Sequence, residues 1–211
     1  MSDENIDLND IRNYFDDKLQ KFGTTHLGVD YNSPHSQEHR FAQLIQILKP
    51  EKSYSLLDFG SGYGSLYGYL SRLGHNLNYF GYDILETMVE EGNNIFKDNP
   101  QCFFSTSLEN IPQVNYAIAS GTFNMKMDFE FQKWQDFVLK NIHIMHEYTS
   151  LGFSFNLLTS YSDSEYMRKD LYYADPCFYF DYCKKHFSKN IALLHDYGLY
   201  DFTILVRKDV E

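Results

Sequence analysis

The chain has 211 residues, a formal net charge of −11, and 29 Asp and Glu against 18 Lys and Arg. Such a length suits one domain. Hydrophobic residues make up 43% of the chain and can form a core, and charged residues make up only 22%, which excludes wholesale disorder. The acidic balance disfavours nucleic acid and anionic membrane surfaces as partners, because both are bound through a basic face.

The sequence shows no targeting or membrane segment. Its opening residues, MSDENIDLND, are acidic and polar, whereas a signal peptide joins a basic stretch to an apolar one. Every apolar run is far shorter than the roughly 20 residues that a membrane helix needs. We therefore expect a cytoplasmic protein.

Apolar spacing predicts the elements in chain order. A helix is expected over 7–22, and a second helix begins at Ser33–Pro34, a cap residue before proline, and stops near Pro50. Short apolar strands then alternate with helical patterns. These strands are expected at 53–59, 77–84, 102–107, 114–120 and 151–160.

Two final strands are expected at 191–198 and 199–208, joined by almost nothing. Parallel strands need a long crossover connection, which this link is too short to form, and the pair is therefore expected to be antiparallel. Strands alternating with helices elsewhere favour an open α/β sheet. We expect seven strands, mostly parallel with one antiparallel strand near the edge, and helices on both faces.

The segment 57–64, LDFGSGYG, joins the first expected strand to a helix. Glycine there permits a sharp turn and the close approach of a ligand, and the helix N-terminus offers free N–H groups. A dinucleotide fingerprint would place its last glycine at Ser65, and a Walker loop would need a lysine. Asp58 would repel a pyrophosphate but attract an ammonium group.

Asp83 ends the second expected strand, 19 residues after Gly64. An acidic residue near this spacing meets ribose hydroxyls, because an ionised carboxylate can accept two hydrogen bonds from a cis-diol. Ile84 and Met88 follow and would border an adenine ring. The alternative for Asp83 is a solvated loop acid.

These residues resemble the class I S-adenosylmethionine (SAM)-dependent methyltransferases, in their small-molecule branch. LLDFGSGYG is similar to the first motif of the family, YFGYDI to its acidic loop, and HDYGLYDFTILVRK to its closing strands. The resemblance covers 38–208. It implies a Rossmann-like sandwich in one compact domain, with 1–50 as a covering segment and 51–211 as the SAM-binding part.

The resemblance also implies SAM as cofactor and S-adenosylhomocysteine (SAH) as product. The glycines would cradle the methionine part, Asp58 its amino end, and Arg40 its carboxylate in fork geometry. Ser107 and Leu108 stand where the family often has an acidic residue, which leaves that adenine contact to the backbone. The implied cofactor residues are Arg40, Asp58, Gly60, Ser61, Gly62, Gly64, Asp83, Ile84, Met88, Ser107, Leu108 and Ser120.

The acceptor is expected beyond the carboxyl ends of the strands, where open α/β sheets bind ligands. Asn124 follows the fourth expected strand, and His195 and Tyr197 lie at the end of the sixth. These three are the candidate catalytic residues. Asn124 would orient an acceptor and His195 would take its proton, since histidine titrates near neutrality. Structural roles are the alternative for each. Candidate substrate contacts are His26, His35, Tyr161, Arg168 and Tyr172.

The function predicted from the sequence is methyl transfer to an oxygen or nitrogen of a small polar metabolite. By analogy, a sugar or a phosphorylated intermediate of surface-polysaccharide biosynthesis fits. We expect a monomer or homodimer and no metal, since His143 and His146 have no third ligand nearby. The alternatives are an NAD(P)-dependent oxidoreductase, which the glycine spacing disfavours, and a non-catalytic SAM-binding partner subunit.

Overall fold

One mixed sheet organises the chain. The computed structural model describes residues 6–49 and 52–208. The strand order is β3-β2-β1-β4-β5-β8-β7, and a short β6 pairs with β5. β8 is antiparallel to both of its neighbours, and the other pairings are parallel. The strands are β1 (Tyr54–Phe59), β2 (Leu77–Tyr82), β3 (Cys102–Ser105), β4 (Val114–Ala119), β5 (Thr149–Thr159), β6 (Tyr173–Ala174), β7 (Asn190–Leu194) and β8 (Asp201–Arg207).

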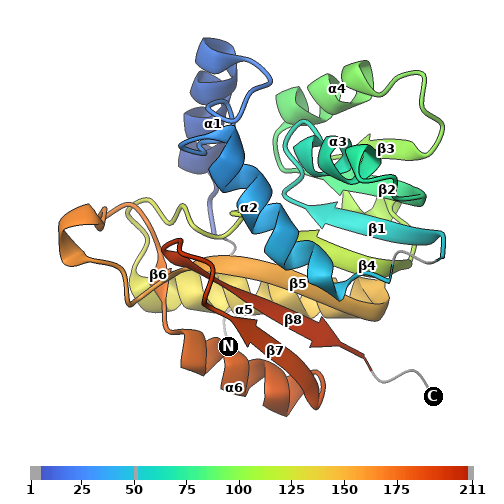
Figure 1. Cartoon of the computed structure of the whole chain (residues 1–211). Coiled ribbons are helices and arrows are strands. Elements are labelled where there is room, and N and C mark those ends of the chain that lie inside the picture. The colour runs from blue at the N-terminus through green and yellow to red at the C-terminus, as the bar shows by residue number, and fades with distance from the viewer. Residues whose placement is uncertain (1–5, 50–51, 209–211) are drawn as a thin grey trace.

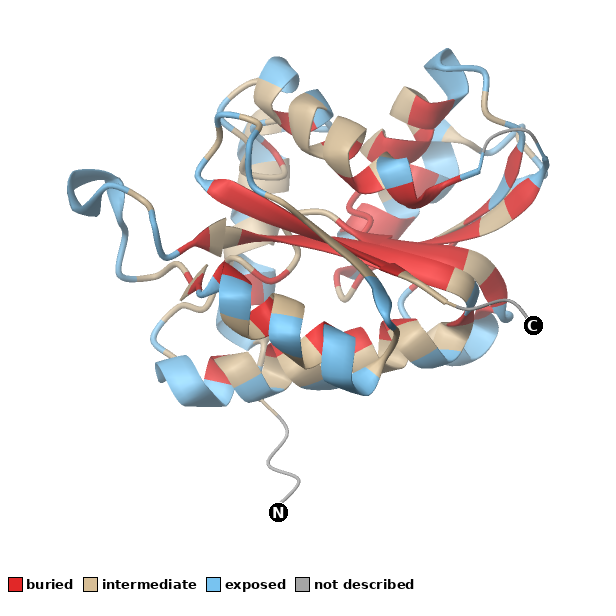
Figure 2. Cartoon of the chain, turned by 60° about the horizontal axis from the view of Figure 1, so that its bottom comes forward, coloured by how far each residue is buried: buried red, intermediate tan, exposed pale blue. Residues whose placement is uncertain are grey.

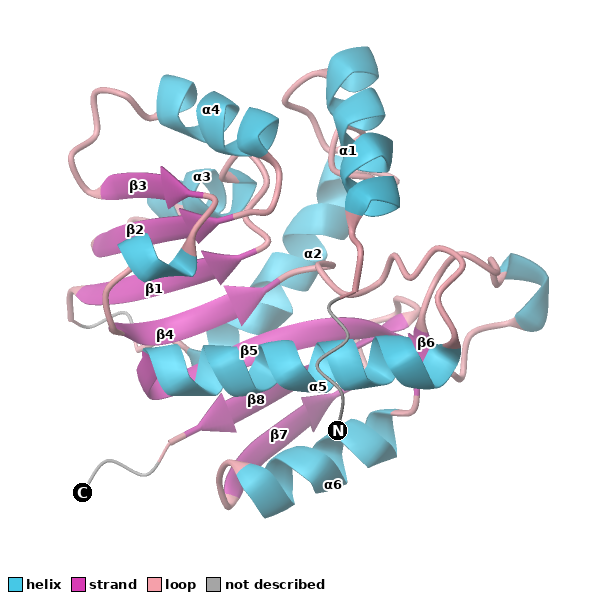
Figure 3. Ribbon diagram, turned by 180° about the vertical axis from the view of Figure 1, so that it is seen from behind, coloured by secondary structure: helices cyan, strands magenta, loops and turns pink. Residues whose placement is uncertain are grey.

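Helices cover both faces of the sheet (Figures 1 and 3). Helices α2, α3 and α4 lie on one face and α5 and α6 on the other, while α1 stands beyond the strand arrowheads. The α-helices are α1 (Asn9–Phe22), α2 (Pro34–Leu44), α3 (Ser65–Arg72), α4 (Glu86–Ile95), α5 (Phe131–Tyr148) and α6 (Pro176–His186). Short 3-10 turns occupy η1 (Ile45–Ile47), η2 (Leu108–Asn110) and η3 (Ser164–Tyr166).

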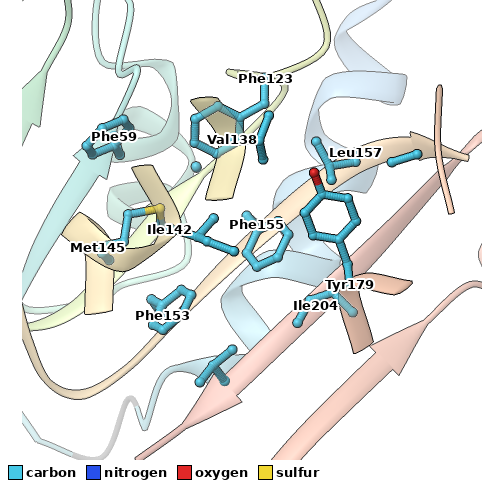
Figure 4. Packing of buried hydrophobic residues seen from close by; sticks show 14 of the residues in the cluster. Phe59, Phe123, Val138, Ile142, Met145, Phe153, Phe155, Leu157, Tyr179 and Ile204 are labelled. Carbon is cyan, nitrogen blue, oxygen red and sulfur yellow. The ribbon is translucent and has the colours of Figure 1, made fainter. Parts of the chain in front are cut away.

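Two apolar cores, one on each face, hold the layers together. The central strands are buried on both sides, as their continuous apolar sequences predict (Figure 2). On the α5 and α6 face, Val138 and Ile142 pack between Phe123, Phe153 and aromatic neighbours from β5 (Figure 4). This packing fixes the carboxyl ends of the strands, where the site lies.

The mostly parallel sheet with one reversed strand is confirmed. The second helix begins as predicted, because Ser33 and Ser36 form a reciprocal capping box and Pro34 occupies the first turn. The last two strands are shorter than expected and are separated by the link 195–200, where Gly198 adopts a φ of 68°. The predicted direct junction is therefore wrong.

Helix α6 was not expected. Asp175 accepts a hydrogen bond from Cys177 N and caps a helix that begins at Pro176. The following aromatic run hides the helical period, because apolar side chains surround the axis. Before it, the segment 160–170 forms a projecting loop that contains η3 (Figure 1).

Candidate active site

A cavity of about 1030 Å³ lies at the carboxyl ends of β1, β2 and β4. Its size is at the upper end of ligand pockets, which hold roughly 300–1,000 Å³. Segments from the whole chain line it, including α1, the loop 29–32, α2 and the projecting loop. Eleven predicted site residues are among its lining: Arg40, Asp58, Gly60, Ser61, Gly62, Asp83, Ile84, Met88, Ser120, Asn124 and Arg168.

The glycine turn after β1 is anchored to the end of β2. Gly60 N and Ser61 N donate to Tyr82 O at 2.7 and 2.9 Å. Gly62 N donates to Asp83 Oδ2 at 2.8 Å. Gly60 and Gly62 both have a positive φ, of 80° and 53°, which glycine adopts without a steric cost. The turn therefore places bare backbone against the cavity.

Gly60 also has no room for a side chain. A Cβ there would lie 2.4 Å from Thr122 Cγ2, and Thr122 is held by its Oγ1 donating to Phe59 O at 2.7 Å. We expect Gly60→Ala to lower the free energy of unfolding by about 2 kcal/mol and to weaken SAH binding about tenfold. Urea denaturation and calorimetric titration measure these two effects.

Gly74→Ala is the matched control. Gly74 has the same φ of 80°, no atom lies within 4 Å of the position of its Cβ, and it does not line the cavity. It therefore carries the backbone strain alone. Equal losses of SAH affinity in the two variants would show that crowding by Thr122 has no part in shaping the site.

Two buried carboxylates face the cavity. Asp83 Oδ2 and Oδ1 accept the N–H groups of Gly62 and Leu85 at 2.8 and 3.0 Å. Asp58 is 2% exposed, and Tyr79 donates to its Oδ2. Among the described residues no donor reaches Asp58 Oδ1, so this oxygen is free to meet a ligand.

Burial raises the pKa of Asp58 to about 7, Tyr79 opposes this rise, and the charge of Asp83 adds to it. Burial also raises the pKa of Asp83, against the opposing N–H donors of Leu85 and Gly62. A cationic group at Asp58 would stabilise its ionised form. The pair thus fits a ligand with an ammonium group near Asp58 and hydroxyl donors near Asp83.

Arg40 lines the cavity and belongs to a buried hydrogen-bond network that also includes Asp201 and Asn156. Its Nε and Nη2 donate to Asp201 Oδ2 at 3.0 and 2.6 Å, and its Nη1 to Ser36 O. Asp201 Oδ1 accepts from Asn156 Nδ2 at 3.0 Å, and Asn156 Oδ1 accepts from Gly121 N at 2.8 Å. Strands β8 and β5 thereby fix the turn after β4.

Tyr31 contacts both Arg40 and the turn after β4. Its ring lies under the Arg40 guanidinium, 5.5 Å from centroid to Cζ, and its hydroxyl donates to Ser120 O at 3.0 Å. Burial raises the pKa of Tyr31 to about 12, so it remains a neutral donor at physiological pH. The loop 29–32 is consequently tied to the turn beside the glycine segment.

The other predicted site residues lie outside the cavity lining. Gly64 begins α3 and faces Phe104, whose Cζ leaves no space for a side chain. Tyr172 is fully buried in the core and bonds Tyr179, which does not match a substrate contact. His195 is exposed near Tyr161. The residues that do not line the cavity are His26, His35, Gly64, Ser107, Leu108, Tyr161, Tyr172, His195 and Tyr197.

Several lining or supporting residues were not predicted as site residues from the sequence. Tyr31 and Gln37 come from the covering segment, and Thr122 from the turn after β4. A usable signal existed for Asp201, since an acidic residue inside an otherwise apolar strand needs a buried partner. Its partner, Arg40, lies 161 positions earlier and could not be inferred from spacing.

Across the described ranges 6–49 and 52–208, no helix has the length and apolarity to cross a membrane. The same residues contain no cluster of three His, Cys, Asp or Glu side chains that could hold a metal.

The sheet order with its reversed strand, together with a glycine turn and two carboxylates at the strand ends, defines a Rossmann-like class I methyltransferase fold. The chain is 42% identical over 164 residues to "Putative methyltransferase Rv1506c" of Mycobacterium tuberculosis (strain ATCC 25618 / H37Rv), covering 78% of this chain and 99% of the relative. The chain belongs to the SAM-dependent methyltransferase family. No family model matches the sequence.

Solved structures share the fold. Magnesium protoporphyrin IX methyltransferase from Synechocystis PCC 6803, with bound SAH, has a TM-score of 0.67 at 14% identity and covers 96% of this chain and 100% of its own. The 1,6-didemethyltoxoflavin-N1-methyltransferase of Burkholderia thailandensis has a TM-score of 0.65 at 16% identity, with 100% and 94% covered. N-methyltransferase NodS of Bradyrhizobium japonicum WM9 has a TM-score of 0.63 at 10% identity, with 94% and 98% covered.

Proposed function

We propose that this methyltransferase binds SAM in the cavity and transfers its methyl group to an oxygen or nitrogen of a small polar metabolite. The observation that carries the proposal is the pairing of the crowded glycine turn with two buried carboxylates on one cavity wall. Asp58 meets the ammonium group of the methionine part, and Asp83 meets the ribose hydroxyls. Ile84 and Met88 border the adenine.

SAM, when bound, supplies a methyl group already activated on a sulfonium, so the chain mainly aligns the reactants and excludes water. The turn 120–122 is suited to this task because Asn156 and Tyr31 hold it from two sides. Arg40 remains a proposed carboxylate contact. Three of its N–H groups are engaged by Asp201 and Ser36, which leaves two of the five for a ligand.

Asn124, His195 and Tyr197 are the proposed catalytic residues on the acceptor side. Asn124 lines the cavity, and its Oδ1 accepts from Leu158 N at 3.1 Å, which orients the amide nitrogen for a ligand. His195 and Tyr197 lie on the link 195–200, outside the lining, and would need this link to move before touching an acceptor. A monomer or homodimer that acts in the cytoplasm, without nucleic acid or membrane partners, completes the proposal.

We expect Asp83→Ala to weaken SAH binding roughly thirtyfold, or about 2 kcal/mol, because the variant loses a charged acceptor of hydroxyl hydrogen bonds. A carboxylate has about four lone-pair sites, so Asp83 can accept ligand hydroxyls besides its two backbone donors. Calorimetric titration with SAH, SAM and NAD in parallel measures the change.

Asp98→Ala is the control, since Asp98 is an exposed carboxylate away from the cavity. Asp83→Asn keeps one acceptor oxygen and should fall between the two variants. Binding of NAD without SAM or SAH would exclude the methyltransferase proposal and favour an oxidoreductase. Tight SAH binding without turnover, together with a co-purifying second polypeptide, would favour a non-catalytic subunit.

A further inference from the structure

The lining of the cavity includes a pair of neighbouring, solvent-exposed tyrosines. Tyr166, on the projecting loop, and Tyr200, on the link before β8, both line the cavity. They remain 63% and 41% exposed, and their ring centroids lie 6.1 Å apart with a 33° tilt. Tyr200 donates its hydroxyl to Asp163, which fixes one ring. Both rings thus offer exposed aromatic surface to a ligand in the cavity.

The positive charges of the described cavity lining are already paired with carboxylates. Arg168 is one of these cations, and its guanidinium donates to both carboxylate oxygens of Asp170. Arg168 Nη1 also lies 4.0 Å from Asp30 Oδ2. The other lining cation among the described residues, Arg40, is paired with Asp201. A phosphate would therefore meet two guanidinium groups whose charge a carboxylate already neutralises.

The cavity also offers partners for hydroxyl groups. Asn32, Asn124 and Ser162 belong to the same lining and supply amide and hydroxyl groups. A saturated ring presents C–H groups to an aromatic face and keeps its hydroxyls at the edge, where these partners and water can reach them. A flat apolar ring could also stack on the tyrosines, but it would leave the polar groups of Asn32, Asn124 and Ser162 without ligand partners.

We propose that the acceptor is a neutral, polyhydroxylated ring of the sugar class, seated on Tyr166 and Tyr200, and that Asp170 selects against phosphorylated acceptors by neutralising Arg168. This inference rests on the proposed methyltransferase function and specifies its acceptor. Tyr166 and Tyr200 are then specificity-determining residues, because they contact the part of the acceptor that does not react.

The test uses the full chain and saturation-transfer NMR with a panel of methyl hexosides, methyl 6-deoxyhexosides and hexose 1-phosphates, with and without SAH. We expect at least one glycoside to bind and the Tyr166→Ala, Tyr200→Ala double variant to weaken that binding at least tenfold. The affinity of the double variant for SAH should stay within twofold of the parent. Tyr161→Ala is the control, because Tyr161 is 69% exposed on the same loop but does not line the cavity.

A second variant tests the charge argument. Asp170→Asn removes the anion that neutralises Arg168 and should strengthen hexose 1-phosphate binding about tenfold without changing glycoside binding. Tighter binding of sugar phosphates than of glycosides by the parent chain would overturn the inference. So would glycoside binding that the double variant retains, or no glycoside binding at all. Failure of SAH to bind while glycosides bind would refute the proposed function alone.

Discussion

Asp201→Ala should lower the free energy of unfolding by about 4 kcal/mol. The Arg40 side chain is 14% exposed and the Asp201 side chain 0% exposed, so the variant leaves a buried guanidinium without its counter-charge. Breaking a buried pair by removing one partner costs roughly 3–5 kcal/mol. Asn156 Nδ2 also loses its acceptor. Urea denaturation followed by circular dichroism measures the loss.

Glu38→Ala supplies the comparison. Glu38 pairs with Arg72 at 2.5 Å, but the two side chains are 48% and 62% exposed, so this bond should contribute less than about 1 kcal/mol. Asp201→Asn keeps the acceptor oxygen for Asn156 and should lie between these two variants. A loss in Asp201→Ala no larger than that in Glu38→Ala would mean that Arg40 reaches water when its partner is removed.

Asp58→Asn should stabilise the unliganded chain at pH 8 by roughly 3 kcal/mol. The folded-state pKa of Asp58, about 7, lies above the value of about 3.9 for an unfolded chain. The folded state therefore holds this proton more tightly, and the carboxylate costs stability as the pH rises from about 4 to 7. Asparagine keeps an acceptor for the Tyr79 hydroxyl but carries no charge.

The gain should shrink to less than about 1 kcal/mol at pH 4.5, where folded Asp58 is already neutral. The same variant should bind SAH more weakly, because it loses the charge that faces the ammonium group. Asp170→Asn is the control, because its expected change in stability at pH 8 has the opposite sign. Arg168 lowers the pKa of Asp170, so that variant should lose stability at pH 8. A pH-independent effect of Asp58→Asn would show that its carboxyl titrates normally.

The placement of the proposed donor-side residues at the cavity was predictable because it depends on short stretches of sequence. The segment 57–64 and Asp83 are placed by two strand ends that follow one another in the sheet. The structure does place Asp58 and Asp83 on one cavity wall, as the spacing indicates. Gly64 differs, since the helix start turns it toward Phe104 rather than toward the cavity.

The acceptor side could not be predicted, because it depends on contacts between distant segments. Tyr172 is aromatic and polar like Tyr166, yet Tyr172 is fully buried with its hydroxyl bonded to Tyr179. Composition cannot separate these two environments. His195 follows β7 as expected, but the link 195–200 directs Tyr200 into the cavity lining instead. The conformations of the two loops therefore determine that Tyr172 is buried and that Tyr200 lines the cavity.

Strand β8 has a consequence for the synthesis of the chain. It is the last strand in sequence, yet it sits between β5 and β7 and supplies Asp201. A nascent chain that ends before residue 201 has the long edge of β5 unpaired, and such edges invite pairing with other chains. The Arg40 network cannot form before residue 201 has been synthesised and β8 has paired with β5. Folding of the site therefore has to wait for β8, and the exposed edge of β5 is prone to aggregation until then.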